Sequence, residues 1–147
     1  MKQTLLLLFS CCMATSGFAQ TDSTNQITVL VNGTDSLVFQ KVDVEATFPG
    51  GLNGWRTYLM QNMKMDRIMA AIPKKTKHWE QQAIVQFIVA KDGSISDIKV
   101  INEVTREVAK EAKRIIAASP AWQPAMQNGR AVKAYRKQPI TFVVDSD

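Results

Sequence analysis

Side chains that ligate metals or act as nucleophiles are scarce in this chain. It has one histidine, His78, and two cysteines, Cys11 and Cys12, which both lie in an N-terminal segment that we expect to be removed. The mature chain would then have no cysteine for a disulfide, a thiolate nucleophile or a zinc site. The sequence has no recognisable serine–histidine–acid motif and no glycine-rich phosphate loop. It therefore predicts a binding protein rather than an enzyme, without a metal, a cofactor or a small-molecule substrate.

The chain also lacks an apolar run of the length that crosses a bilayer, which takes about 20 residues. The N-terminal run Leu5–Phe9 follows Lys2 and extends weakly to Ala14. Gly17-Phe18-Ala19 then fits the small-x-small cleavage pattern, so residues 1–19 are predicted to be a secretory signal peptide. A lipid on Cys11 or Cys12 and a short inner-membrane anchor are the alternatives, although Phe9 is too large for its place in the lipid-attachment motif.

Basic residues outnumber acidic ones, which gives a net charge of +5 and an isoelectric point of about 9.4. Loss of Lys2 with the signal peptide would leave 17 basic and 13 acidic residues, so 17 − 13 = +4. Export argues against nucleic acid as a partner. A basic cluster is either a solvated face or a surface that steers an acidic receptor segment, peptidoglycan or lipid head groups. Its members are Lys64, Arg67, Lys74, Lys75 and Lys77.

Residues 20–47 are predicted to form an N-terminal extension with a β-hairpin. Its apolar runs, Ile27–Val31 and Leu37–Phe39, flank Asn32-Gly33, which is a strong hairpin signal. Whether a hairpin over residues 27–40 would cover or extend a sheet edge stays open.

A helix is predicted after Phe48-Pro49-Gly50-Gly51, where proline followed by glycine suits a type II turn. Apolar residues recur there at helical spacing, and these are Leu52, Trp55, Leu59 and Met63. A second short helix over Met65–Ile72 would end at Pro73.

Two antiparallel strands and another helix are predicted next. Ala83–Ala90 is apolar on both faces apart from Gln86, which indicates a central strand, and Asp92-Gly93 is a tight turn into the strand Ser94–Ile101. Thr105 is a plausible N-cap for a helix that ends at Ser119-Pro120, because the residue before a proline is pushed out of the α region.

The last stretch contains a tryptophan between two prolines and a proline within a strand. Trp122 is interpreted as a core residue rather than a partner contact, and Asn128-Gly129 as a turn. The final strand, about Ala134–Val144, contains Pro139, which cannot donate to a sheet ladder, so the strand belongs at an edge or next to a bulge. Such an edge either recruits another strand or stands idle and protected. The candidate partner-binding residues are Ala134, Tyr135, Arg136, Lys137, Gln138, Ile140 and Phe142.

The order of elements predicts the fold class. Helix, strand, strand, helix, strand (α-β-β-α-β) over residues 48–147 indicates a two-layer α+β domain, with the helices packed on one antiparallel sheet.

Several of these segments resemble the C-terminal domain of the TonB family of energy transducers. The resemblance covers about residues 48–144, and its last third is the most specific part. The matching segments are Phe48-Pro49-Gly50-Gly51, Phe87-Ile88-Val89, Asp92-Gly93-Ser94-Ile95, Ala109 with Ala112, Pro120-Ala121-Trp122-Gln123-Pro124-Ala125, Asn128-Gly129-Arg130-Ala131-Val132 and Pro139-Ile140-Thr141-Phe142.

The resemblance implies a periplasmic, non-enzymatic module. Such domains bind a peptide of an outer-membrane TonB-dependent receptor by adding it to the edge of the last strand, in energy-dependent transport. The chain departs from the family plan because it has no convincing transmembrane anchor and no proline-rich spacer. Ile72-Pro73 stands where the family has Tyr-Pro, and Glu80-Gln81-Gln82 stands where it has a glycine. An accessory or structural envelope protein that binds itself or peptidoglycan is the alternative.

Analysis of the mature N-terminus tests the predicted export. We expect the mature protein to begin at Gln20, as a soluble periplasmic chain. A lipid on Cys11 or Cys12 would identify an anchored form, and an intact Met1 would contradict cleavage. N-terminal sequencing or intact-mass measurement distinguishes the three outcomes.

Overall fold

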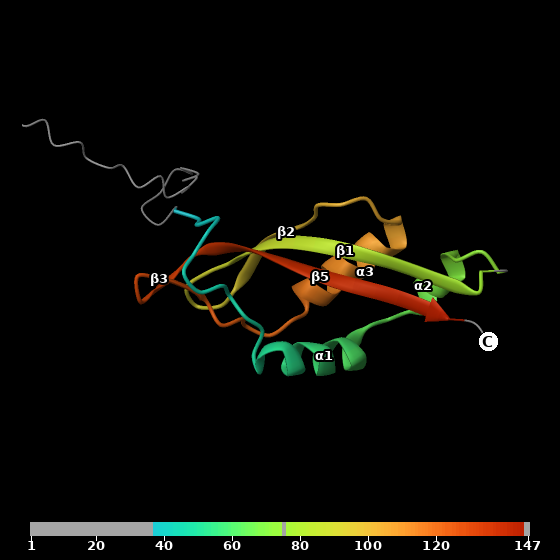
Figure 1. Cartoon of the computed structure of the whole chain (residues 1–147), viewed down its shortest axis with the longest axis horizontal. Helices are drawn as coiled ribbons and strands as arrows, with labels where there is room; N and C mark the ends of the chain where they lie inside the picture. The colour runs from blue at the N-terminus through green and yellow to red at the C-terminus, as the bar shows by residue number, and fades with distance from the viewer. Residues whose placement is uncertain (1–36, 75, 146–147) are drawn as a thin grey trace, which may run out of the picture.

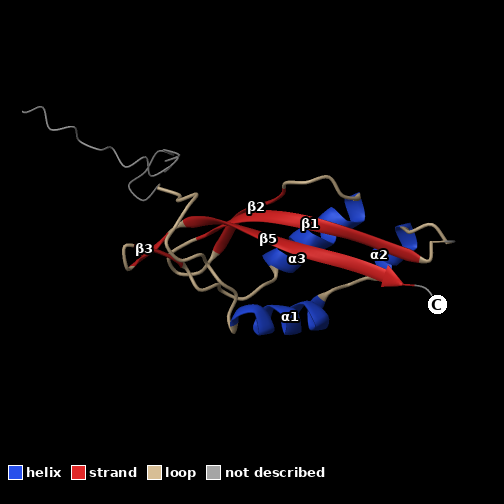
Figure 2. Ribbon diagram, viewed as in Figure 1, coloured by secondary structure: helices blue, strands red, loops and turns tan. Residues whose placement is uncertain are grey.

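The computed structural model describes residues 37–74 and 76–145, which form an antiparallel sheet with helices packed on one face (Figures 1 and 2). In chain order the elements are α1 (Gly51–Asn62), α2 (Asp66–Ala71), β1 (His78–Val89), β2 (Ile95–Val100), α3 (Arg106–Ala117), β3 (Ala125–Gln127), β4 (Arg130–Val132) and β5 (Ala134–Asp145). The predicted α+β class is confirmed. The predicted signal peptide and the first strand of the predicted hairpin lie outside the described residues.

The main sheet has the order β2-β1-β5, with β1 antiparallel to both neighbours. The β1–β5 register runs without interruption from His78 opposite Asp145 to Val89 opposite Ala134. The β1–β2 register shifts between Gln86 and Ile88. The sheet order confirms that the Ala83–Ala90 segment is central and that the proline-bearing strand lies at an edge.

The core lies between this sheet and α3. Alternate β1 side chains from Ala83 to Val89 point toward the helices, as the period of two in a strand requires, and are fully buried. α3 presents Val108, Ala112 and the pair Ile115-Ile116 to them, all fully buried. Each large apolar side chain buried in this way contributes about 1.5–3 kcal/mol, so this layer holds most of the described fold together.

α1 packs on the core mainly through Trp55, which is 5% exposed. Its predicted apolar face is wrong at Leu52, which is 64% exposed. Phe48 takes the place beside Trp55 at this end, because a turn with a Gly51 N–H to Phe48 C=O bond of 2.8 Å folds it back. The Phe48 and Trp55 ring centroids are 5.3 Å apart, edge to face. Phe48 therefore packs beside Trp55 at the start of the helix, where Leu52 was expected to pack.

Trp122 joins the turn of the β1–β2 hairpin to this aromatic group. Its side chain is 3% exposed, with ring centroids 4.9 Å from Phe87 and 5.6 Å from Phe48. Its indole N–H donates to Ser119 Oγ at 3.0 Å, and its backbone N–H donates to the Gly93 C=O at 2.9 Å. The interpretation of Trp122 as a core residue is confirmed.

In the described residues, no helix is both long enough and apolar enough to span a membrane. The predicted short helix over Met65–Ile72 is present as α2, whereas the small β3–β4 hairpin around Asn128-Gly129 was expected only as a turn.

Gly93→Ala should unfold the domain more easily, because the added Cβ would lie 2.1 Å from the Trp122 carbonyl oxygen. Gly129→Ala is the matched control, since Gly129 also has a positive φ but a Cβ there meets nothing within 4 Å. We expect Gly129→Ala to lose about 1 kcal/mol of unfolding free energy from backbone strain and Gly93→Ala at least about 2 kcal/mol more. Urea unfolding followed by tryptophan fluorescence measures both, and equal losses would contradict the close approach.

Candidate binding edge

One long side of β5 is paired and the other is largely open. The inner side bonds to β1 along its full length. On the outer side, the described residues supply only one bridge, at Phe39. The Phe39 N–H donates to the Lys133 C=O and the Tyr135 N–H donates to the Phe39 C=O, both at 2.9 Å. Among the described residues, no strand therefore pairs with the outer side from Lys137 to Val143, which we call the open edge (Figure 2).

Odd-numbered β5 residues direct their backbone groups outward. The Tyr135 N–H bonds to Phe39 on that side, and N–H and C=O directions alternate along a strand. The residue opposite Pro139 gives an independent check. Ile84 donates its N–H to Asn102 Oδ1 at 2.7 Å, and its C=O accepts from the Ile101 N–H at 3.0 Å, so both groups face β2. The missing N–H of Pro139 therefore lies on the open edge and interrupts no β1–β5 hydrogen bond.

The seven candidate residues predicted on this strand divide between its two faces. Ala134, Ile140 and Phe142 are at most 1% exposed, and their side chains belong to the core. Arg136 and Gln138 share that face and are partly buried. Only Tyr135 and Lys137 project from the face opposite the helices.

Beyond Tyr135, the outward backbone groups of β5 belong to Lys137, Pro139, Thr141, Val143 and Asp145, and the sequence-based candidates include only the first of these. The sequence did hold a signal for the whole row. A proline inside a paired strand has to turn its missing N–H outward, so the position of Pro139 identifies every second residue as outward-facing.

The segment 38–48, which we call the strap, runs from the start of β5 to β3. Beyond Phe39, it forms antiparallel bridges at Val44 with Met126 and at Thr47 with Gln123. The Asp43 carboxylate accepts the Asn128 N–H at 2.8 Å and so holds the β3–β4 turn. The strap thus occupies the first part of the outer side of β5 with the chain's own backbone.

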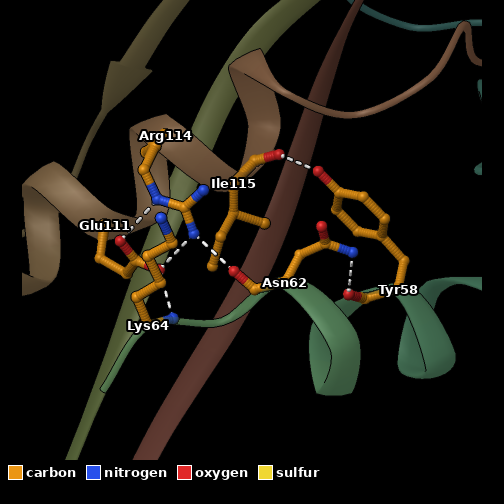
Figure 3. Close-up of polar contacts among 6 residues, drawn as sticks. All are labelled: Tyr58, Asn62, Lys64, Glu111, Arg114 and Ile115. Atoms are coloured by element: carbon orange, nitrogen blue, oxygen red, sulfur yellow. Dashed lines mark hydrogen bonds and ion pairs between the residues drawn. The ribbon is translucent and has the colours of Figure 1, made fainter. Parts of the chain in front are cut away.

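A polar cluster ties α1 and the residues after it to α3 (Figure 3). The Tyr58 hydroxyl donates to the Ile115 C=O at 2.9 Å, and Arg114 Nη2 donates to the Asn62 C=O at 2.5 Å. Glu111 accepts from Arg114 Nε at 2.8 Å and from the Lys64 N–H at 2.7 Å. Because Trp55 is the only buried residue of α1, these bonds contribute much to holding the helix in place.

Glu111 is buried but charged. Burial acts to raise the pKa of its carboxyl, yet the hydrogen bonds from Arg114 and the Lys64 N–H, together with the positive charges of both residues, outweigh burial and lower the pKa. The ion pair with Arg114 raises the pKa of the guanidinium in turn.

The described members of the predicted basic cluster lie in two parts of the chain, around α2 and in the α2–β1 connection. Lys64 and Arg67 line a hollow of about 480 Å³ whose lining contains acidic as well as basic residues. The other lining residues are Asp66, Glu107, Lys110, Glu111 and Arg114. Lys74 and Lys77 are exposed in the α2–β1 connection, and Lys75 lies outside the described residues.

His78 lies at the start of β1, with Nδ1 2.5 Å from Asp145 Oδ1, and this hydrogen bond raises the pKa of its imidazole. Within the ranges 37–74 and 76–145, no three acidic, histidine or cysteine side chains are grouped as metal ligands would be.

Comparison with known proteins identifies the domain. The family described as Gram-negative bacterial TonB protein C-terminal matches residues 74–144, from the α2–β1 connection almost to the end of β5. Residues 74–144 match this family, which confirms over that range the resemblance seen in the sequence. No curated protein matches the chain. Domains of this family are periplasmic, non-enzymatic protein-interaction modules that bind outer-membrane receptors. The strap, α1 and α2 precede the matched segment.

Glu111→Gln should weaken the fold at neutral pH by about 1–3 kcal/mol, because the amide loses the charge-assisted bonds from Arg114. A carboxyl whose pKa is lowered on folding stabilises the protein above its unfolded value of 4.5, and that stabilisation is lost as the pH falls through the lower folded pKa. The difference between wild type and Glu111→Gln should therefore shrink as the pH falls below about 4.5. Urea unfolding at several pH values measures it. Glu103→Gln, at an exposed position, is the matched control for the loss of one carboxylate charge.

Proposed function

We propose that this chain is a periplasmic binding module that takes an extended segment of an outer-membrane TonB-dependent receptor as an added strand on the open edge of β5. The single observation that carries the proposal is the outward row from Lys137 to Val143, with which no strand in residues 37–74 or 76–145 pairs, next to a complete inner ladder with β1. A strand added there gains main-chain hydrogen bonds irrespective of its sequence, and its side chains provide selectivity. The domain would act in energy-dependent transport.

The chemistry of the edge favours weak and reversible binding. A solvent-exposed main-chain hydrogen bond contributes about 1 kcal/mol net, and ordering each residue of an extended peptide costs a similar amount. Additional affinity has to come from side chains on the face opposite the helices, where Tyr135 and Lys137 lie. An acidic residue in the peptide would complement Lys137.

Titration of the mature chain with synthetic N-terminal peptides of outer-membrane receptors, followed by NMR, tests the proposal. We expect amide shift changes concentrated on Lys137, Thr141 and Val143. Shifts spread evenly over the surface, shifts on the outer side of β2, or no shifts would count against edge addition.

Two variants at one position separate the backbone contribution from the side chain. Lys137→Pro removes an outward donor and should weaken binding of the peptide about fivefold, the equivalent of one hydrogen bond of about 1 kcal/mol. Lys137→Ala keeps the N–H and removes only the charge. If the two variants weaken binding equally, the backbone bond plays no part.

The alternative role, as an accessory or structural envelope protein, predicts different results. A peptidoglycan pull-down that retains the chain, or light scattering that shows a stable oligomer without any peptide response, would favour it over receptor binding.

A further inference from the structure

We propose that Pro139 makes the open edge of β5 accept a foreign strand in preference to a second copy of the same strand. The foreign partner rests on the proposed function, whereas the disfavoured self-pairing rests on the edge geometry alone. The proposal rests on the outward direction of the missing N–H. Pro139 removes one donor from the open edge and leaves every β1–β5 hydrogen bond in place.

A foreign strand laid along the open edge loses one hydrogen bond at Pro139. Its own carbonyl at that point has no donor, and every other outward residue can still bond. When two copies of β5 related by a two-fold axis pair with each other, two hydrogen bonds are lost, because each copy contributes its own proline. This also holds when the prolines lie opposite each other, since such a pair would normally exchange two bonds.

The strap makes this penalty difficult to avoid. Since Phe39 occupies the outer side up to Tyr135, a second copy can use only the outward residues from Lys137 to Asp145, the last residue of β5. Among these outward residues, the longest symmetric register that leaves out Pro139 pairs Thr141 with Asp145 twice and Val143 with its own copy. Any register with more residue pairs includes both prolines.

The two losses have different consequences for the two equilibria. One restored main-chain bond is worth about 0.5–1.5 kcal/mol, which is roughly a two- to tenfold change in a dissociation constant. A symmetric dimer gains two such bonds, so its dissociation constant should change by the square of that factor. Pro139 therefore weakens self-pairing much more than it weakens binding of another strand.

Pro139→Ala tests the inference without disturbing the fold, because Ile84 and Pro139 exchange no hydrogen bonds across the β1–β5 ladder. We expect the purified wild-type chain to be monomeric and Pro139→Ala to form a dimer, measured by sedimentation equilibrium at concentrations up to about millimolar. Cross-strand amide contacts at Thr141 and Val143 in NMR spectra would place the interface at β5.

The double variant Pro139→Ala with Thr141→Pro is the matched control. Thr141 is also an outward residue, and the Gln82 C=O opposite it already accepts from Asn102 Nδ2 at 2.7 Å. The double variant has the same number of outward donors as the wild type, with the gap two residues further along. It should be monomeric again, whereas a side-chain effect of removing Pro139 would leave it dimeric.

A series of peptides tests whether affinity follows the number of hydrogen bonds missing at position 139. Synthetic peptides copying residues 134–144, with either proline or alanine at position 139, are titrated into the wild type and into Pro139→Ala. The proline pair lacks two bonds, each mixed pair lacks one and the alanine pair lacks none. Each replacement should strengthen binding by the same two- to tenfold factor.

The possible results separate this inference from the proposed function. Dimerisation of Pro139→Ala, without binding of any receptor peptide, would support the role of Pro139 and contradict the receptor proposal. A Pro139→Ala variant as monomeric as the wild type would overturn the inference. A wild type already paired through β5, or equal affinities across the peptide series, would overturn it as well.

Discussion

The antiparallel pairing of β1 with β5 is the interaction on which the rest of the structure depends. Its register runs from His78–Asp145 to Val89–Ala134 without a bulge, so it determines the face on which every side chain of β5 lies. One face carries Ile140 and Phe142 into the core against α3. The same register places Pro139 opposite a residue whose backbone groups are already bonded toward β2. A shift by one residue would expose the core residues and place the proline inside the ladder, so packing and hydrogen bonding select the same register.

Two groups of contacts hold the remaining elements against this pair of strands. At one end, Trp122 bonds to Gly93 and contacts the rings of Phe48 and Phe87, which brings together the hairpin turn, the start of α1 and the chain after α3. Elsewhere, Arg114 and Glu111 fasten the end of α1 to α3 through backbone groups. α1 is therefore held by an aromatic group and a polar cluster in addition to its predicted apolar face, of which Trp55, Leu59 and Met63 pack on the core and Leu52 does not.

Much of this arrangement could be predicted from local signals. The apolar segment around Phe87, the helix stop at Ser119-Pro120 and the edge position implied by Pro139 each depend on a rule that acts within a few residues. What could not be predicted depends on contacts distant in sequence. Leu52 matched the helical pattern but is exposed, because Phe48 is folded back against Trp55. The bridge from Phe39 to β5 joins segments about a hundred residues apart, and no local pattern announces it. The division of the candidate residues between core and surface could have been predicted from the position of Pro139 alone. Residues an even number of positions from Pro139 lie on its face of the strand, and the others lie on the core face.

An edge strand that binds a partner has to satisfy two opposing demands, because it must remain unpaired in the free protein and still offer a ladder to the correct segment. Under the proposed function, β5 meets the first demand through the strap at its start and the missing donor at Pro139, and it meets the second through the outward groups of Lys137, Thr141 and Val143. Neither device weakens the inner ladder with β1, since Phe39 and Pro139 both act on the outer side. The inner side of β5 thus sets the stability of the strand and its outer side sets whether the edge is open, so the outer side can change while the fold is kept.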